Sequence, residues 1–236
     1  MNVSFNFENN DVVVVGGSKG IGYEVCKQFK IAGANVTSIS RTKCTYPGVI
    51  NINCDISDSN NLSINIKKIK NVDILINVAG TNLCEPIEQI DENEWDRVLN
   101  TNLKSFFIII KHVASIMKKN KKGKIVNVSS IAGRNKSIVS GVHYTSSKYG
   151  IIGLTKQVAQ ELGPFNINVN CICPSQTMTK MLKESMTQSQ ISTLEKRIPI
   201  RRISSVKEQA GPILFLCSDI ASYIHGAAID INGGQL

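Results

Sequence analysis

The chain has 236 residues, 42% of them hydrophobic and 19% charged, with a formal net charge of +9. These proportions are typical of a globular protein and exclude a disordered or collagen-like chain, and the length suits one domain over residues 1–236. The longest apolar runs, such as Val12–Val15 and Phe106–Ile110, are too short to cross a bilayer. The first residues show no secretory signal and the seven scattered cysteines fit reduced thiols, so a cytoplasmic location is expected.

The basic residues are densest in one run, Lys118–Lys124, where a helix is expected to end and a strand to begin. Cations at this place complement the C-terminus of a helix, and docking of an acidic partner is the alternative. Nucleic-acid binding is disfavoured, because no aromatic residues interleave with the cations. No metal site is expected either, since the three histidines are isolated and Cys171-Ile172-Cys173 lacks a second ligand pair at zinc spacing.

Short, apolar, β-branched runs alternate along the chain with helical stretches. Because these runs lack polar alternation, they indicate strands covered on both faces, as in a parallel sheet flanked by helices. The expected fold class is therefore α/β, a doubly wound sheet of about seven parallel strands with helices on both faces. The predicted strands are Val12–Val15, Val36–Ser40, Val49–Asn53, Ile74–Asn77, Ile125–Val128, Ile167–Ile172 and Ala228–Ile231.

Four helices are predicted between these strands. Gly33 and the pair Gly163-Pro164 are typical stop signals for the first and the third. The stretch Thr42–Val49 is short and contains Pro47-Gly48, so a loop is expected there in place of a crossover helix. The predicted helices are Gly22–Gly33, Asn93–Lys118, Tyr144–Leu162 and Val206–Leu216.

The first predicted strand leads into a glycine-rich turn. Glycines allow a sharp turn and a close approach to a pyrophosphate, while the free N–H groups at the start of the next helix favour an anion. A Walker A phosphate loop is excluded, because Lys19 precedes its glycine and no Gly-Lys-Ser/Thr follows. The turn predicts a dinucleotide site, the alternative being a tight turn without a ligand; its residues are Gly16, Ser18, Lys19, Gly20, Ile21 and Gly22.

The second predicted strand ends in Ser40-Arg41-Thr42. An acidic residue at this place usually marks a dinucleotide without a 2′-phosphate. A guanidinium can instead bind that phosphate through two hydrogen bonds, and Lys19 can supply a second cation. The sequence therefore predicts NADP(H), with Ser40, Arg41 and Thr42 in its site; a merely solvated Arg41 is the alternative.

Tyr144 and Lys148 stand four residues apart, on one face of a predicted helix. A phenol is a poor acid or base at neutral pH, but a lysine cation beside it favours phenolate and brings its pKa towards the working range. Such tuning suits general acid–base chemistry, although this pair alone recurs by chance in many helices. The preceding His143 either touches a substrate or packs at the start of the helix.

Further motifs occur in order along nearly the whole chain: Gly16-x-x-x-Gly20-x-Gly22, Asn77-Val78-Ala79-Gly80, Asn102, Ser129-Ser130, Tyr144-x-x-x-Lys148, Pro174 with Thr179, Ser218–Gly226 and Asp230–Gly234. The ordered set resembles the short-chain dehydrogenase/reductase family in its classical subgroup, and is most similar to 3-oxoacyl-acyl carrier protein reductases and small carbonyl reductases. The resemblance implies a Rossmann-type sheet in a single dinucleotide-binding and catalytic domain.

The resemblance implies catalytic roles for four residues. Tyr144 would give a proton to a ketone oxygen that Ser130 also contacts by a hydrogen bond. Lys148 would hold the nicotinamide ribose and tune Tyr144, and Asn102 would anchor a water that relays protons towards Lys148. Hydride transfer puts negative charge on the carbonyl oxygen, which prepositioned donors stabilise. By the same resemblance, the cofactor would also contact Asp55, Ile56, Asn77, Ala79, Gly80, Pro174, Thr177 and Thr179.

The chain departs from the family pattern in four places. The segment from Ser130 to Tyr144 is one residue longer than the commonest spacing, so it must bulge to keep the two side chains together. Ser129 is the alternative to Ser130. The other departures are single replacements that affect local hydrogen bonds, at Val15, Val78 and Ser175.

The resulting hypothesis is an NADPH-dependent reductase that converts a ketone, such as a 3-oxoacyl thioester on an acidic acyl carrier protein, into a secondary alcohol. Lys121 and Lys122 are expected near the rim of the site, where they suit such a carrier, whereas the neutral stretch Gly163–Asn166 does not. The alternatives are a small carbonyl or diketone reductase, an NAD-linked ring-diol dehydrogenase and a non-catalytic dinucleotide-binding sensor.

A substrate lid is expected over Met178–Ile198. Its apolar side chains would cover an acyl chain or simply pack on one another. The family resemblance also implies a homotetramer.

Overall fold

The computed structural model describes residues 4–137 and 139–236 and contains a sheet of seven parallel strands in the order β3-β2-β1-β4-β5-β6-β9. The predicted strands are confirmed, with ends that shift by one or two residues at most. Strand order reverses at β1, which places a ligand-binding crevice at the carboxyl ends of β1 and β4. The strands are β1 (Asp11–Val15), β2 (Asn35–Ser40), β3 (Ile50–Asn53), β4 (Ile74–Asn77), β5 (Gly123–Val128), β6 (Ile167–Pro174) and β9 (Ala228–Ile231).

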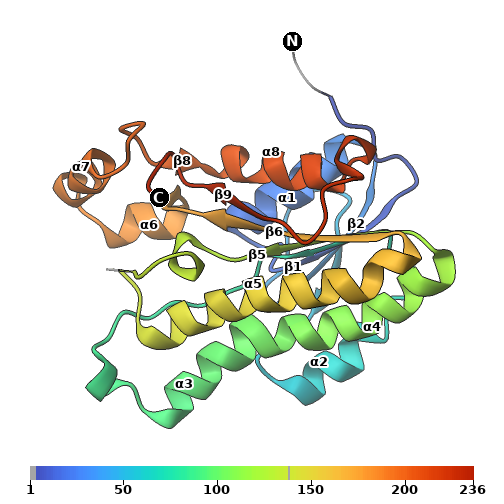
Figure 1. Ribbon diagram of the computed structural model, residues 1–236, viewed down its shortest axis with the longest axis horizontal. Helices are drawn as coiled ribbons and strands as arrows, with labels where there is room; N and C mark the ends of the chain where they lie inside the picture. Colours follow the sequence, from blue (N-terminus) through green and yellow to red (C-terminus); the bar gives the residue numbers. More distant parts are fainter. Residues whose placement is uncertain (1–3, 138) are drawn as a thin grey trace.

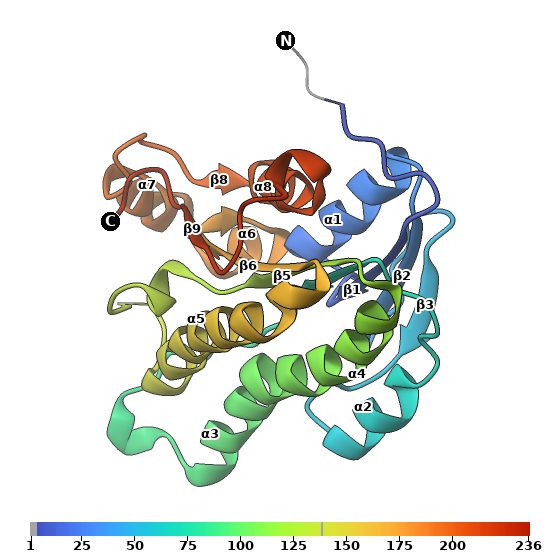
Figure 2. The same cartoon turned by 45° about the vertical axis from the view of Figure 1, so that its right-hand side comes forward.

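Helices cover both faces of the sheet: α1 (Gly20–Ile31), α2 (Ser59–Ile66), α4 (Ser105–Asn120), α5 (Val142–Leu162) and α8 (Val206–Cys217). α1 and α8 pack side by side on one face, while α2, α4 and α5 cover the other (Figure 1, Figure 2). Successive strand residues point to opposite layers, so Val13 is buried under α4 and α5 and Val14 under α1 and α8. The expected doubly wound, Rossmann-type fold is confirmed.

The helix predicted over 93–118 differs from the observed one. α3 (Glu92–Leu99) and α4 are joined by a π-turn at Asn100–Lys104, in which the backbone hydrogen bonds span one residue more than in an α-helix. The sequence did not predict α2, because its residues are mostly polar; the Asp58 side chain caps it by accepting from two backbone N–H groups. The expected loop at 42–49 is confirmed.

A separate small layer lies beyond the carboxyl end of β6, at the left of Figure 1. It consists of α6 (Lys180–Ser185), α7 (Gln188–Lys196) and the paired short strands β7 (Thr177–Met178) and β8 (Ser204–Ser205). This is the region expected to form a lid. Its apolar side chains pack on one another, although the side chain of Met181 lies outside the described part; the packed groups are Met178, Leu182, Met186, Ile191, Leu194, Ile198 and Ile203.

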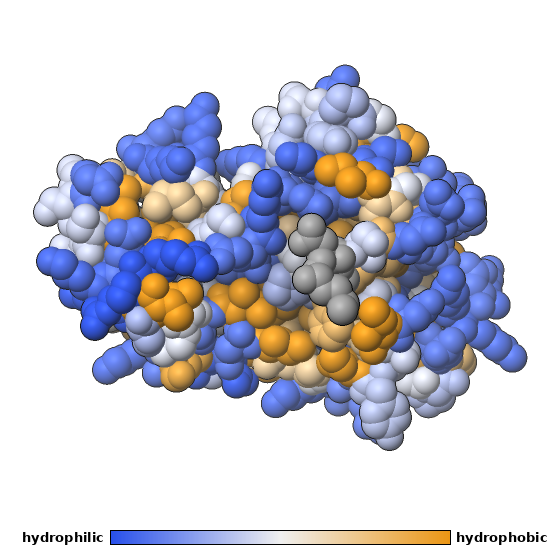
Figure 3. Space-filling model, turned by 90° about the horizontal axis from the view of Figure 1, so that it is seen from above, coloured by the Kyte–Doolittle hydropathy of each residue, from blue (hydrophilic) through white to orange (hydrophobic). Residues whose placement is uncertain are grey.

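Short 3-10 turns complete the described elements, at Ile87–Gln89, Ile131–Gly133, Gly163–Phe165 and Asp219–Ala221. None of the helices in the described ranges is long and apolar enough to pass through a membrane. The face formed by α1 and α8 is mostly hydrophilic, with hydrophobic groups exposed in patches (Figure 3).

The basic run 118–124 ends α4 and begins β5, as predicted, with Lys121 in the left-handed conformation at φ 50°. It therefore lies at the amino end of β5, whereas Ser130 follows the carboxyl end, about 20 Å away along the strand. The expectation that Lys121 and Lys122 lie near the rim of the site is wrong. Lys122 instead lines a pocket at the opposite end of the sheet, together with Asp73.

Asn127 is a polar residue in the middle of the sheet, and it is fully buried. Its Oδ1 accepts a hydrogen bond from Asn77 Nδ2 at 2.9 Å, and its Nδ2 donates to Thr155 Oγ1 at 2.9 Å. Asn127→Ala should lower the free energy of unfolding by about 2–4 kcal/mol, because it leaves buried polar groups unpaired and opens a cavity. Urea titration measures this, with the exposed Asn60→Ala as a control expected to change it by less than about 0.5 kcal/mol. Equal stability of the two variants would contradict the expectation.

Candidate active site

The glycine turn follows β1 at the carboxyl edge of the sheet. Gly16 has a φ of +91°, which favours glycine, and a β-carbon there would lie 2.7 Å from the Cα of Ala79. A β-carbon on Gly22 would overlap the Gly16 carbonyl oxygen. The glycines therefore let the chain turn against the loop that follows β4 and begin α1 at once.

The start of α1 is open to an anion. Lys19 is the N-cap residue but makes no capping hydrogen bond with its side chain, and the first turn contains no acidic residue. The N–H groups and the dipole of the helix therefore suit the predicted pyrophosphate. Thr179, from the chain that follows β6, lies beside this turn, because a β-carbon on Gly20 would be 3.4 Å from Thr179 Cγ2.

The end of β2 lies next to the glycine turn. Thr42 Oγ1 donates a hydrogen bond to Ser18 Oγ at 2.9 Å, and Ser40 Oγ donates to the Thr42 carbonyl at 2.7 Å. Both Lys19 and Arg41 are exposed. The structure thus brings together the residues predicted to select the 2′-phosphate.

Asp55 follows β3 and accepts hydrogen bonds from the Ser57 N–H at 3.0 Å and the Ser57 hydroxyl at 2.7 Å. Burial acts to raise its pKa, but these hydrogen bonds and the nearby charge of Arg41 outweigh it and hold the pKa below its ordinary value. Asp55 is therefore ionised at neutral pH. Its neighbour Ile56 packs in the hydrophobic core.

Ser130 lies against Tyr144, so the longer segment between them does not separate the two side chains. Ser130 Oγ accepts a hydrogen bond from the Ala132 N–H at 3.1 Å, which leaves its own hydrogen for the phenol of Tyr144, whose pKa it acts to lower. The neighbouring Ser129 is buried, and its hydroxyl donates to the Lys148 carbonyl at 2.8 Å. Ser129 therefore holds α5 against the sheet, and Ser130 is the hydroxyl that faces the phenol.

Lys148 lies one helical turn after Tyr144 and is almost fully buried. Its Nζ is 5.5 Å from the centre of the Tyr144 ring and donates a hydrogen bond to the Val128 carbonyl at 3.0 Å. A β-carbon on Gly80 would be 3.6 Å from the same nitrogen. The phenol, the ammonium group and the loop after β4 therefore lie together, as the motifs predict.

Burial sets the charge states of this pair. It raises the pKa of Tyr144, and the hydrogen bond with Ser130 offsets this only in part. Burial also lowers the pKa of Lys148 to about 8, against an opposite effect of Cys173 and Cys171. The net lowering of the phenol pKa that the sequence predicts is not found, because burial disfavours the phenolate by more than its neighbours favour it. Tyr144 is consequently protonated at neutral pH and can act as a proton donor.

Asn102 lies in the π-turn and is fully buried. Its Oδ1 accepts from the Thr81 N–H at 2.8 Å, and its Nδ2 donates to the Thr81 carbonyl at 3.0 Å and to Ser147 Oγ at 3.1 Å. The side chain therefore joins the loop after β4 to α5, next to Lys148. The water relay implied by the family resemblance stays a prediction.

Other residues of the predicted cofactor site use their side chains within the protein. Asn77 is fully buried, and its side chain donates to Asn127 inside the sheet. Thr177 Oγ1 donates to the Ser175 carbonyl at 3.2 Å, and the Thr179 hydroxyl caps α6. Pro174 is the last residue of β6. The side chain of Asn77 is therefore directed into the sheet and not towards the crevice.

Sequence reasoning missed one contact that shapes the site. Arg134 follows Ser130 closely and forms an ion pair with Asp230 of β9, with 3.0 Å between Nη2 and Oδ2. This pair ties the segment before α5 to the last strand of the sheet. The two residues are far apart in the chain and nothing in the sequence pairs them.

Known proteins resemble this chain over its whole length. The family described as enoyl-(acyl carrier protein) reductase matches residues 15–235. The chain is 33% identical to the 3-oxoacyl-[acyl-carrier-protein] reductase of Chlamydia trachomatis serovar D, over 96% of this chain and 97% of that protein. It is 32% identical to an acetoacetyl-CoA reductase from an Acinetobacter species, over 96% and 98%. The structure of a putative NAD(P)-dependent gluconate 5-dehydrogenase from Beutenbergia cavernae, with bound NADP, has a TM-score of 0.92, 25% identity and 99% coverage of both chains.

A glycine turn at the switch point of a parallel sheet, together with a phenol, a hydroxyl and a lysine at the neighbouring strand ends, defines an oxidoreductase that uses a nicotinamide dinucleotide. The chain belongs to the short-chain dehydrogenase/reductase family and is an enzyme of that family.

The lowered pKa of Lys148 makes stability depend on pH. Above about pH 8 the native lysine loses its proton, while the unfolded chain keeps it up to about pH 10.4, so the free energy of unfolding rises with pH in this window. Between about pH 7 and about pH 9.5, the wild type should gain about 2 kcal/mol relative to Lys148→Met.

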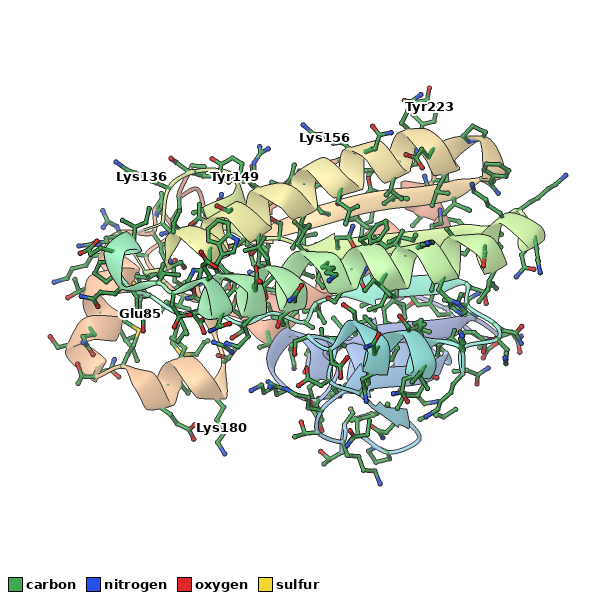
Figure 4. The ribbon with its side chains drawn as sticks, turned by 90° about the horizontal axis from the view of Figure 1, so that it is seen from below. Glu85, Lys136, Tyr149, Lys156, Lys180 and Tyr223 are labelled. Atoms are coloured by element: carbon green, nitrogen blue, oxygen red, sulfur yellow. The ribbon has the colours of Figure 1, made fainter. Side chains whose placement is uncertain are left out.

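Urea titrations at the two pH values measure this gain. Lys156→Met, on the exposed side of the same helix (Figure 4), is the control and should show no such gain. A pH-independent difference between Lys148→Met and the wild type would contradict the lowered pKa.

Proposed function

We propose that the protein is an NADPH-dependent reductase that converts a ketone into a secondary alcohol, with a 3-oxoacyl thioester as the substrate. The observation that carries this proposal is the placement of the Ser130 hydroxyl against the phenol of Tyr144, beside the buried nitrogen of Lys148. A protonated phenol and a second hydroxyl at one place are what a carbonyl oxygen requires as it gains negative charge.

Each residue of the site has one task in this reduction. Bound NADPH supplies the hydride to the carbonyl carbon. As charge develops on the carbonyl oxygen, Ser130 donates a hydrogen bond to it and Tyr144 gives it a proton. The ammonium group of Lys148 then stabilises the phenolate, which the protein interior would otherwise disfavour. Asn102 holds the loop beside Lys148 and anchors the water through which the proton is replaced.

The glycine turn and its neighbours fit NADP(H). The uncapped start of α1 offers N–H groups to the pyrophosphate, and the turn can be built only with glycine at positions 16 and 22. Exposed Arg41 and Lys19 would bind the 2′-phosphate, with the Ser40 and Thr42 hydroxyls beside it. Asp55, Ile56, Ala79 and Gly80 would border the adenosine, and Pro174, Thr177 and Thr179 the nicotinamide.

A thioester substrate is supported by the relatives and by the shape of the lid. Two relatives are named for 3-oxoacyl-[acyl-carrier-protein] and acetoacetyl-CoA, both 3-oxo thioesters. An open pocket of about 240 Å³ lies between α7 and the segment before α5, where Val139, Met186 and Leu194 offer apolar surface to an acyl chain.

The exposed charges at this end of the molecule favour neither coenzyme A nor an acyl carrier protein as the group that carries the thioester. Exposed Lys136 and Lys180 lie at this end of the molecule, but so does exposed Glu85 (Figure 4). A free coenzyme A thioester therefore suits the site as well as one on an acidic carrier protein.

We further propose that one domain over residues 1–236 carries both the cofactor site and the catalytic site, and that copies of it pair through α4 and α5 into a homotetramer. Exposed Phe107 on α4 and Tyr149 on α5 support such pairing. All seven cysteines lie in the described part of the chain and none of them forms a disulfide, which supports a cytoplasmic location.

Tyr144→Phe should lower kcat for an acetoacetyl thioester by about 10³-fold, because the proton donor is lost while the ring remains. The Kd for NADPH should change by less than about threefold. Steady-state NADPH oxidation and calorimetry measure the two quantities, and Tyr223→Phe, at a fully exposed tyrosine, is the control. A wild type that binds NADPH but reduces no carbonyl in a panel of thioesters, diketones and sugars would favour the sensor alternative.

Arg41→Asp should weaken NADPH binding by about 10- to 100-fold, because a charged hydrogen bond is lost and a carboxylate repels the 2′-phosphate. Binding of NADH should be unchanged or stronger. Lys43→Asp makes the same change of charge two residues away and should have a much smaller effect. A wild type that binds NADH as tightly as NADPH would disprove the choice of cofactor.

A further inference from the structure

Helix α5, which carries the proposed proton donor, begins without the usual cap. Its N-cap is Gly141, which has no side chain to accept a hydrogen bond from the first turn. The N–H normally bound by such a side chain belongs to the third helical residue, and in α5 this is Tyr144. The backbone N–H of Tyr144, the proposed proton donor, is therefore the group that lacks its usual side-chain acceptor at the start of α5.

His143 supplies the missing acceptor from inside the helix. Its Nδ1 lies 2.9 Å from the backbone nitrogen of Tyr144 and accepts the hydrogen bond. The ring is fully buried and fills the space in front of Gly141, because a β-carbon on Gly141 would lie 2.6 Å from Cε1 and 2.8 Å from Nδ1 of the ring. The absence of a side chain at Gly141 therefore leaves the space that the His143 ring occupies.

The other edge of the imidazole faces an acidic residue of α3. His143 Nε2 lies 3.7 Å from Oε1 of Glu94 and is buried, with no hydrogen-bond partner among the described residues. Glu94 is held by two hydrogen bonds from Arg97, at 2.7 Å and 2.8 Å. Because Nδ1 is an acceptor, the neutral ring carries its proton on Nε2, where the carboxylate favours it.

We propose that His143 is a positioning residue for Tyr144: its Nδ1 replaces the absent N-cap side chain, and Glu94 orients the ring from the other side. The inference rests on the proposed function, in which Tyr144 gives the proton. The phenol must stay within hydrogen-bond reach of Ser130, and a displacement of about 1 Å can cost about 100-fold in rate. His143 itself transfers no proton and contacts no substrate.

Three substitutions separate capping from packing. His143→Asn keeps an acceptor oxygen near the position of Nδ1 but loses the ring. His143→Phe keeps a ring but has no acceptor, and His143→Ala loses both. The readouts are kcat and KM for an acetoacetyl thioester, the Kd for NADPH, and the Tm of each protein.

If His143 positions Tyr144, His143→Phe and His143→Ala should lower kcat by about 10- to 100-fold, with KM and Kd within about threefold of the wild type. His143→Asn should restore kcat to within about threefold. A packing role predicts the opposite order, with His143→Phe close to the wild type and His143→Asn impaired. That order, or an unchanged kcat in His143→Ala, would overturn the proposal.

Nitrogen NMR of the wild type tests the hydrogen bond without any activity. The His143 signals, identified by their loss in His143→Asn, should show an unprotonated Nδ1 and a protonated Nε2 at neutral pH. The Tyr144 amide should also exchange faster with solvent in His143→Phe than in His143→Asn. A protonated Nδ1 would overturn the proposal even in an active enzyme. If the wild type consumes no NADPH, the proposed function fails, and the NMR result still decides whether His143 caps α5.

Discussion

A half-buried phenol such as that of Tyr144 can serve as an acid only if its surroundings keep it protonated beforehand and stabilise the anion afterwards. In this protein burial does the first, since it raises the pKa of Tyr144. Lys148, one turn away on the same helix, is placed to do the second. Both groups depend on α5 being held rigidly, by Ser129 at the Lys148 carbonyl and by Asn102 at Ser147. α5 packs along one face of the sheet, and its first turns carry these two groups at the carboxyl edge of the strands.

The parallel sheet explains why residues so distant in sequence meet at one place. All carboxyl ends of parallel strands lie on one edge, so the turns after β1, β4, β5 and β6 converge there. Inside the sheet, hydrogen bonds link Asn77 of β4 to Asn127 of β5 and then to Thr155 of α5. The strand that precedes the loop at Val78–Gly80 and the helix that carries the phenol are therefore joined through buried amides.

Local patterns in the sequence predicted the strands and the glycine turn, because each of these features depends on only a few consecutive residues. Features that depend on tertiary surroundings were not predictable. The pKa of Tyr144 depends on burial, and the inward direction of the Asn77 side chain depends on its partner in β5. Lys121 was misplaced because it is close to Ser130 in sequence, although a whole strand separates the two. The π-turn at Asn102 interrupts a stretch that is helical on both sides, so the sequence predicted one helix over 93–118.

The π-turn also constrains the length of the chain. An α-helix turns by about 100° per residue, so the surplus residue between α3 and α4 rotates one helix about its axis relative to the other. α3 then packs against the start of α5, while α4 covers the sheet beside α2. Losing or gaining a single residue in Asn100–Lys104 would change the rotation of α3 relative to α4 by about 100°. Apart from Asn102, whose side chain is fully buried and hydrogen-bonded, the side chains of this stretch can be exchanged more easily than the number of its residues can change.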